Sequence, residues 1–340
     1  ELPYAIEFHG VSVTYPEEGE GMLGKGKADR ADDRKVALSD LWLGVRPGEA
    51  TALAGSSKAG KSTALQVLTG NVVYSGQAFL CNSPADAALE RASDVLSYCP
   101  SDDVSWGHLT VRETMLLHAS IRGLGEQPGW QSGVSPCTTD ELVDSTLREV
   151  RLADCSHQLM NKISAADRRK TELAACLMGA APVVLLDEPT RGLDIASKQQ
   201  MWGFITTCVR AGSAVLLATN AMDEVEAVCN QVAILVAGEL CTVGDIQALK
   251  EHYGSMYTIH LSCVPGVDPS EVHQFVNRLF KSEVSHGSSE RAGEYTFQVP
   301  KLGLGMLREV FNSLEDPSSK KSVNLSGFSV SQPSLQQVLL

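Results

Sequence analysis

The sequence contains no apolar run of the roughly 18 to 20 residues that a membrane-spanning helix needs. Its longest apolar stretches, at 176–186 and 214–218, are short or interrupted by Gly179, Pro182 or charge. No signal peptide is recognisable, and the chain starts at Glu1 without an initiator Met. We therefore expect these residues to lie outside a bilayer.

The sequence also lacks paired cysteines and an excess of basic residues. Its nine cysteines are odd in number and form no CxxC pair, which argues against a disulfide framework or a zinc site and for a reducing compartment. Asp and Glu outnumber Lys and Arg by 41 to 28, giving a net charge of −13. Such an acidic chain is not expected to bind nucleic acid.

Length and composition are sufficient for two hydrophobic cores. A chain of 340 residues with 43% hydrophobic residues can form one large α/β domain and a smaller one.

The strongest motif is GSSKAGKST at 55–63, which fits the phosphate-loop pattern GxxxxGK(S/T). The preceding EATALA favours a strand and the following STALQVLTG a helix, which is the context this motif requires. Two glycines let the backbone curl so that its amides face a phosphate, the lysine reaches β and γ oxygens, and the serine can ligate Mg²⁺. The predicted ATP-binding residues here are Gly55, Ser56, Ser57, Lys58, Ala59, Gly60, Lys61, Ser62 and Thr63.

A second motif, VVLLDEPT at 183–190, supplies what a phosphate loop lacks. Its four apolar residues predict a fully buried strand. Asp187 at the carboxyl end of that strand can hold Mg²⁺ through water, and Glu188 can polarise an attacking water. The predicted metal ligands are therefore Ser62 and Asp187, and the predicted general base is Glu188.

These motifs and three others occur in one order along the chain: YCP at 98–100, a basic helix beginning at Ser164 in SAADRRK (164–170), and Thr219-Asn220 after an apolar strand. The whole resembles the nucleotide-binding domain of an ATP-binding cassette (ABC) transporter. YCPSDD, LTVRE, MDEVEAVCNQVAILVAGEL and the terminal FSVSQPSLQQVL make it similar to the A subfamily, the lipid-exporting branch.

The resemblance implies further roles. Tyr15 falls where the family stacks an aromatic ring on adenine, and Asp194 lies in a loop that faces a partner cassette. The signature motif, which contacts the partner's ATP, corresponds to Ser164, Ala165, Ala166 and Asp167. At two further catalytic positions the sequence differs from the family. Ser101 occupies the position of the glutamine that contacts the metal, and Asn220 occupies the position of the switch histidine.

Other departures concern glycines. Lys58 replaces a loop glycine, which costs about 1 to 2 kcal/mol if the backbone is left-handed there. Ala165 and Ala166 replace signature glycines whose bare backbone approaches a γ-phosphate. The intact Lys61, Ser62, Asp187 and Glu188 predict Mg-ATP binding. The departures, including Ser101 and Asn220, predict that hydrolysis is weak. A fully active transport ATPase and a soluble non-transport cassette protein remain alternatives. GTPase and kinase interpretations are disfavoured, since no NKxD string follows and only the phosphate loop favours a kinase.

The resemblance also implies a fold and a setting. It implies an α/β P-loop cassette with a mixed-sheet core, an antiparallel β subdomain and a helical subdomain at about 99–180, followed by a small α+β ferredoxin-like regulatory domain. The expected bounds are 1–250 and 256–340. The expected partners are a second cassette, transmembrane domains outside this chain and a lipid substrate handled by those domains. The chain would then be a piece of an integral membrane transporter, at the cytosolic face of a membrane.

Local patterns add three expectations. Alternation at 5–15 predicts an opening antiparallel strand pair. The charged, Gly-rich segment 17–35 predicts a mobile insertion. A hairpin is expected to turn at Ala237-Gly238, within 232–243.

Overall fold

The computed structural model describes residues 4–16, 34–124, 138–253, 256–263, 272, 274–277, 285–286, 294–300 and 325–331. The chain divides into two units, Glu1–Gly244 and Asp245–Leu340. Residues 17–33 of the predicted insertion lie outside the described residues. Its last two positions, Arg34 and Lys35, belong instead to a strand.

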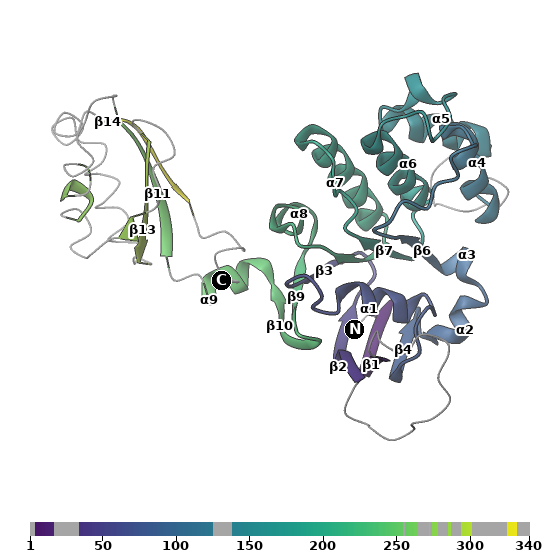
Figure 1. The fold of residues 1–340 in the computed structure, drawn as a ribbon, viewed down its shortest axis with the longest axis horizontal. Coiled ribbons are helices and arrows are strands. Elements are labelled where there is room, and N and C mark those ends of the chain that lie inside the picture. The colour runs from purple at the N-terminus through teal and green to yellow at the C-terminus, as the bar shows by residue number, and fades with distance from the viewer. Residues whose placement is uncertain are drawn as a thin grey trace, which may run out of the picture. The chain divides into compact units, whose positions relative to one another are not determined.

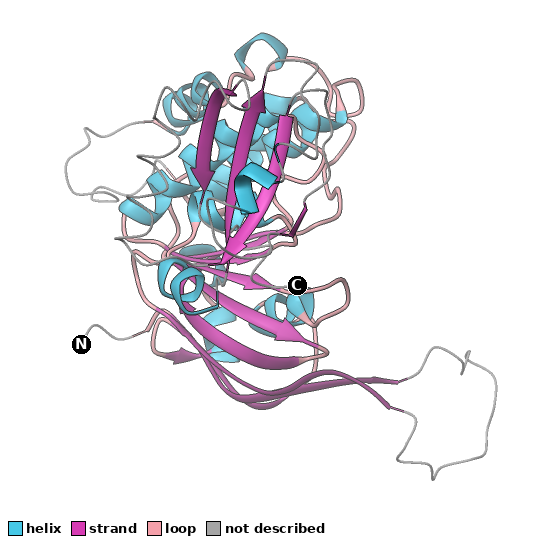
Figure 2. Ribbon diagram, turned by 90° about the vertical axis from the view of Figure 1, so that its left-hand side faces the viewer, coloured by secondary structure: helices cyan, strands magenta, loops and turns pink. Residues whose placement is uncertain are grey.

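The first unit opens with an antiparallel sheet in the order β2-β1-β4-β5. Figure 2 shows its two longest strands running side by side. The predicted strand pair within 5–15 is wrong: these residues form one strand, because Gly10 (φ 61°) lies at an irregularity in the pairing and does not turn the chain. The strands are β1 (Ile6–Pro16), β2 (Arg34–Val45), β4 (Ser75–Leu80) and β5 (Ser83–Pro84).

A second sheet of the first unit has the order β10-β9-β3-β8-β7-β6, and its five strands from β9 to β6 run parallel. Its outer pair, β9 and β10, is separated by Ala237 (φ 50°) and Gly238 (φ 88°), so the predicted turn is confirmed. The strands are β3 (Ala50–Ala54), β6 (Leu96–Cys99), β7 (Val183–Asp187), β8 (Ala214–Ala218), β9 (Gln231–Val236) and β10 (Glu239–Asp245).

Helices cover both faces of the parallel strands (Figure 1). On one side, α1 (Lys61–Leu68) lies between the two sheets and shares their apolar cluster. On the other side lies a helical layer made of α4 (Val111–Ile121), α5 (Thr139–Glu149), α6 (Ala165–Leu177) and α7 (Ile195–Arg210). The smaller helices of this unit are α2 (Ala85–Leu89), α3 (Ala92–Val95), the 3-10 turn Ala153–Cys155 and α8 (Met222–Val228).

Side chains of β7 alternate between the two clusters. Val183 and Leu185 pack with the cluster around α1, whereas Val184 and Leu186 pack with the helical layer. All four are completely buried, as the apolar run predicts for a parallel strand covered on both faces. The strand is thereby held from both sides up to Asp187.

Polar caps start the helices of this layer. Thr110 begins α4 and Thr138 begins α5, each in a capping box with the glutamate three residues later. Ser164 caps α6 and Asp194 caps α7, each accepting a hydrogen bond from a backbone amide of the first turn. Two residues predicted to face a partner cassette thus also fix the beginning of a helix.

The second unit begins with α9 (Ile246–Tyr253) and contains an antiparallel sheet in the order β12-β13-β11-β14. A ferredoxin-like unit has this same strand order and the same antiparallel neighbours, but the segments that join the strands fall mostly outside the described residues. Its strands are β11 (Met256–Cys263), β12 (Ser285–His286), β13 (Glu294–Pro300) and β14 (Leu325–Ser331). In the described part of the chain, no helix is both long and apolar enough to cross a membrane.

Replacing Leu185 by Ala should lower the free energy of unfolding of the first unit by about 2 to 5 kcal/mol, because it opens a cavity in a strand buried on both faces. Urea denaturation followed by tryptophan fluorescence measures this. Val73→Ala, at a side chain that is 92% exposed, is the control and should change stability by less than about 0.5 kcal/mol. Equal midpoints for the two variants would contradict the assignment of Leu185 to the core.

Candidate functional site

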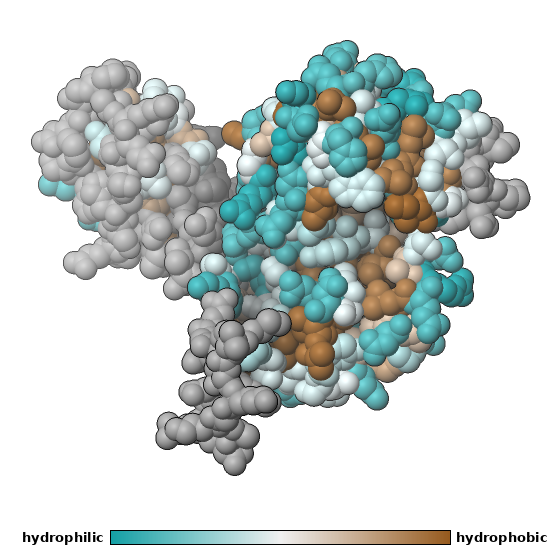
Figure 3. All heavy atoms as spheres, turned by 45° about the vertical axis from the view of Figure 1, so that its right-hand side comes forward, coloured by the Kyte–Doolittle hydropathy of each residue, from teal (hydrophilic) through white to brown (hydrophobic). Residues whose placement is uncertain are grey.

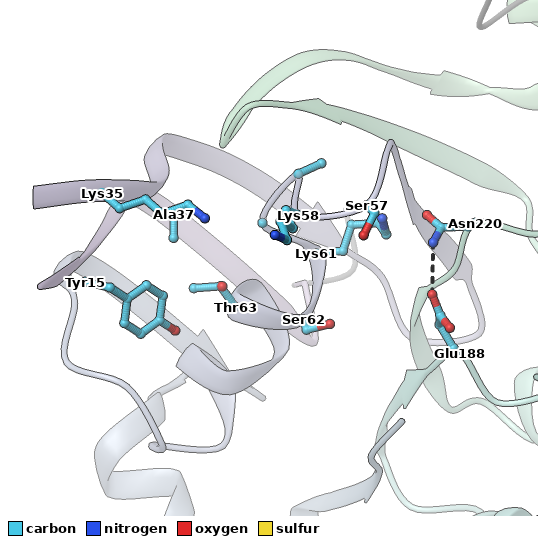
Figure 4. A pocket seen from close by; sticks show the side chains of 12 residues that line it. Tyr15, Lys35, Ala37, Ser57, Lys58, Lys61, Ser62, Thr63, Glu188 and Asn220 are labelled. Carbon is cyan, nitrogen blue, oxygen red and sulfur yellow. Dashed lines mark hydrogen bonds between the residues drawn. The ribbon is translucent and has the colours of Figure 1, made fainter. Parts of the chain in front are cut away.

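A pocket of about 280 Å³ opens beside the phosphate loop. In Figure 4, Tyr15 and Lys35 lie on one side of the loop, and Asn220 and Glu188 on the other. Most of the sequence-predicted residues come together there. The residues that line the pocket are Tyr15, Lys35, Ala37, Ser57, Lys58, Ala59, Gly60, Lys61, Ser62, Thr63, Glu188 and Asn220.

Both loop glycines are required by close backbone contacts. Gly55 has φ 153°, and a Cβ there would lie 2.2 Å from the Leu235 carbonyl oxygen. Gly60 has φ 103°, and a Cβ there would lie 2.4 Å from the Ala37 carbonyl oxygen. No side chain fits at either position, which agrees with the motif.

Lys58 has φ 66°, so the loop does need a left-handed backbone where the family has glycine. The backbone is left-handed here, so the predicted strain of about 1 to 2 kcal/mol applies to Lys58. Its side chain is exposed at the pocket.

Lys61 begins α1 and is 7% exposed. Its ammonium donates hydrogen bonds of 2.8 Å to the carbonyl oxygens of Gly55 and Ser56. These two loop residues do not line the pocket, and their contact with it is through Lys61. Burial lowers the pKa of Lys61, and the negative charges of Glu188 and Asp187 oppose that shift. The lysine is thus held at the centre of the loop.

Ser62 and Asp187 offer oxygen atoms, which Mg²⁺ prefers. Asp187 is 3% exposed, and burial raises its pKa, while a hydrogen bond from Ser62 lowers it. The described residues contain no group of three or more His, Cys, Asp or Glu side chains that could hold a metal ion. The two oxygen donors Ser62 and Asp187 fit a Mg²⁺ ion, whose remaining ligands would be phosphate oxygens and water, the usual arrangement for this ion.

Glu188 lies opposite the loop in a left-handed backbone, φ 43°. Its amide donates to the Ala218 carbonyl oxygen of β8 (2.8 Å). The Asn220 amide nitrogen donates to Glu188 Oε1 (2.9 Å), and Arg191 Nη1 lies 3.5 Å from Oε2. Each carboxylate oxygen of the predicted base therefore has a partner within the chain.

Tyr15 lies on β1 in register with Lys35 of β2. Its hydroxyl donates to Gln66 Oε1 of α1 (3.1 Å), so the ring position is fixed by a contact that sequence reasoning missed. Lys35 was also missed as a pocket residue, because it was assigned to the insertion. The alternation of β2 is the signal that could have found it.

Ser101 and the signature residues Ser164 to Asp167 do not line this pocket. Ser164 donates to Asp167 Oδ2 (2.7 Å) at the start of α6, and Ala165 is exposed. Ser101 follows β6 and is partly buried.

Arg169 is a residue whose importance the sequence analysis missed. It is 8% exposed and extends from α6 to four carbonyl oxygens: Pro100 (2.6 Å), Asp187 (2.9 Å), Glu188 (3.1 Å) and Pro189 (3.0 Å). One guanidinium, with its fixed fork of donors, thereby joins the signature helix to the segments after β6 and β7.

Glu224 of α8 connects the segments that follow β7 and β8. It is 1% exposed, accepts a 2.8 Å hydrogen bond from the Thr190 hydroxyl, and is also hydrogen-bonded by Thr219. Burial raises its pKa, and these hydrogen bonds lower it. The contact fixes Thr219, which immediately precedes Asn220.

A family model described as ABC transporter matches residues 38–191. ATP-binding cassette sub-family A member 9 of Mus musculus is 34% identical over 90% of this chain, and retinal-specific phospholipid-transporting ATPase ABCA4 of Homo sapiens is 31% identical over 89%. The chain spans only 18% and 13% of the length of these relatives.

Solved structures give the same fold. An ATP-binding subunit of an ABC transporter aligns with a TM-score of 0.60 and 21% identity, over 74% of this chain and 93% of that one. A dimeric ATP-binding cassette in a post-hydrolysis state, bound to ADP and Pi, aligns with a TM-score of 0.58 and 19% identity, over 71% and 98%. The predicted cassette fold is confirmed. The chain therefore carries an ABC transporter domain of the cassette fold, with members of sub-family A among its relatives.

Proposed function

We propose that this chain is the ATP-binding cassette of a sub-family A transporter, that it binds Mg-ATP in the pocket of loop 55–63, and that it hydrolyses ATP slowly. The observation that carries the proposal is the geometry of one pocket, where Lys61 and Ser62 at the beginning of α1 face Glu188 after β7 and Asn220 after β8. Tyr15 at the far side of the loop supports binding of the adenine ring.

Slow hydrolysis is supported by the contacts of Glu188. A general base must be free to accept a proton from water. Here Oε1 already accepts a hydrogen bond from Asn220, and Oε2 lies 3.5 Å from Arg191 Nη1, so each carboxylate oxygen has a partner within the chain before water approaches. Asparagine at the switch position also lacks the basicity of histidine. The complete Asp187-Glu188 pair instead favours the alternative, a fully active cassette.

Pairing with a second cassette is supported by the dimeric structural neighbour. In this chain the signature residues begin α6, away from the pocket, so we propose that they serve a partner's ATP. Asp194, which caps α7, would lie at the same interface.

A membrane setting is supported by the relatives and by the surface. One relative is named as a phospholipid-transporting ATPase, so we propose lipid transport by transmembrane domains outside this chain, with the cassette at the cytosolic face. Figure 3 shows apolar patches among the polar surface of the first unit. Val104, Trp106 and Ile121, each more than half exposed, are candidates for contact with such domains. For the unit from 256 to 340 we propose a regulatory role.

Lys61→Ala should abolish ATP binding, because it removes the ammonium at the centre of the loop and leaves the carbonyl oxygens of Gly55 and Ser56 without their donor. Isothermal titration calorimetry with Mg-ATP measures the affinity. Lys198→Ala, at a partly buried lysine of α7 outside the pocket, is the matched control and should bind as the wild type does. Equal affinity of wild type and Lys61→Ala would exclude this loop as the nucleotide site.

Reversion of four departures together, Ser101→Gln, Ala165→Gly, Ala166→Gly and Asn220→His, should raise ATP turnover by on the order of 10² or more. A single preorganised donor at a developing charge contributes that much. Phosphate release is measured at several protein concentrations, because a composite site needs a partner. Adding Glu188→Gln to the reverted chain should remove the gain. A wild-type rate near ~10 s⁻¹, typical of enzymes and unchanged by the reversions, would favour the fully active cassette.

A further inference from the structure

Lys58 combines a left-handed backbone with a side chain that has no hydrogen-bond or ion-pair partner among the described residues. Its left-handed φ of 66° favours glycine, and nothing in the backbone requires a lysine there. The side chain is exposed, and no hydrogen bond or ion pair of Lys58 is formed with any residue that the structure describes. Strained positions of this kind concentrate at ligand sites.

The neighbouring Lys61 differs in each respect. It is 7% exposed, and two of its three ammonium hydrogens are directed to the carbonyl oxygens of Gly55 and Ser56. Lys58 lies three residues earlier in the same loop, on the same pocket, with its donors available (Figure 4). The ammonium of Lys61 is therefore hydrogen-bonded to the loop's own backbone, whereas that of Lys58 has no partner among the described residues.

The charge of the pocket is opposite to that of the chain. The net charge is −13, yet the residues lining the pocket include Lys35, Lys58 and Lys61 against the single carboxylate of Glu188. Three ammonium groups around one opening concentrate positive potential there. Such a field fits a ligand with several negative charges, and within it Lys58 is the cation on the phosphate loop that has no partner of its own in the described residues.

We propose that Lys58 is a second phosphate-binding lysine, which donates to the β and γ oxygens of ATP beside Lys61 and makes nucleotide binding less dependent on Mg²⁺. This rests on the proposed ATP site at residues 55–63. Mg²⁺ and ammonium groups act on the same oxygens by neutralising their charge, so an additional ammonium retains affinity when the ion is removed. In a cassette with slow hydrolysis, this lysine would serve to retain nucleotide.

Two variants test the effect of the Lys58 charge separately from that of its backbone conformation. Lys58→Met and Lys58→Arg both keep a long side chain in the left-handed position, but only Arg keeps the cation. The affinity for ATP is measured by calorimetry, with Mg²⁺ and with EDTA in its place. In EDTA, Lys58→Met should bind ATP about 10- to 100-fold more weakly than the wild type, the range of one charge-assisted hydrogen bond, and Lys58→Arg within about threefold of it. With Mg²⁺, the loss in Lys58→Met should be smaller than in EDTA.

Lys35→Met is the matched control, since it removes the same charge from the other side of the pocket. It should lose less affinity in EDTA than Lys58→Met. Equal losses in these two variants would overturn the proposal in favour of a general field, and so would unchanged binding by Lys58→Met or undetectable binding by the wild type in EDTA. Wild-type-like binding by Lys61→Ala in Mg²⁺ would instead remove the ATP site itself, so the two failures are distinguishable.

Discussion

The site depends on a single constraint, the burial of neighbouring parallel strands on both of their faces. Their carboxyl ends meet at one edge of the sheet, and the loops that leave this edge carry the chemistry. The phosphate loop follows β3, Asp187 ends β7, and Thr219 follows β8. The register fixes their heights, because Leu53 and Asp187 both pair with Ala218. Residues about 30 to 160 positions apart in sequence therefore meet without any long-range motif that specifies the meeting.

Two buried polar residues then hold these loops against one another. Arg169 joins the segments after β6 and β7 through backbone carbonyls, and Glu224 joins Thr190 to Thr219. Burying a polar or charged group costs free energy unless its hydrogen bonds are satisfied, so Arg169 and Glu224 stay buried only while the loops keep their places. The same contacts that lower the cost of burying them thus define the geometry of the pocket.

Sequence reasoning reached the elements that local patterns determine. The run at 183–186 indicated a doubly covered strand, Ser164 indicated a helix start, and the glycines of the loop indicated tight backbone, all in agreement with the structure. It did not reach contacts between distant elements. Arg169 looked like one more basic residue on a helix, and its carbonyl partners are not encoded by any side-chain pattern. Lys35 was lost for another reason, because the charged segment before it hid the start of β2.

Under the proposed function, the contact between Glu188 and Asn220 would satisfy the fold and slow hydrolysis at the same time. Glu188 is held in a left-handed conformation just after β7, and its carboxylate is partly buried. The Asn220 amide donates a hydrogen bond to that carboxylate at 2.9 Å. An amide does not titrate near neutral pH, whereas an imidazole does, so this pair has no protonation state in which asparagine can take up or release a proton. Asn220 can therefore donate a hydrogen bond to Glu188 but cannot take part in moving a proton, so the proposed slow hydrolysis is compatible with an intact site geometry.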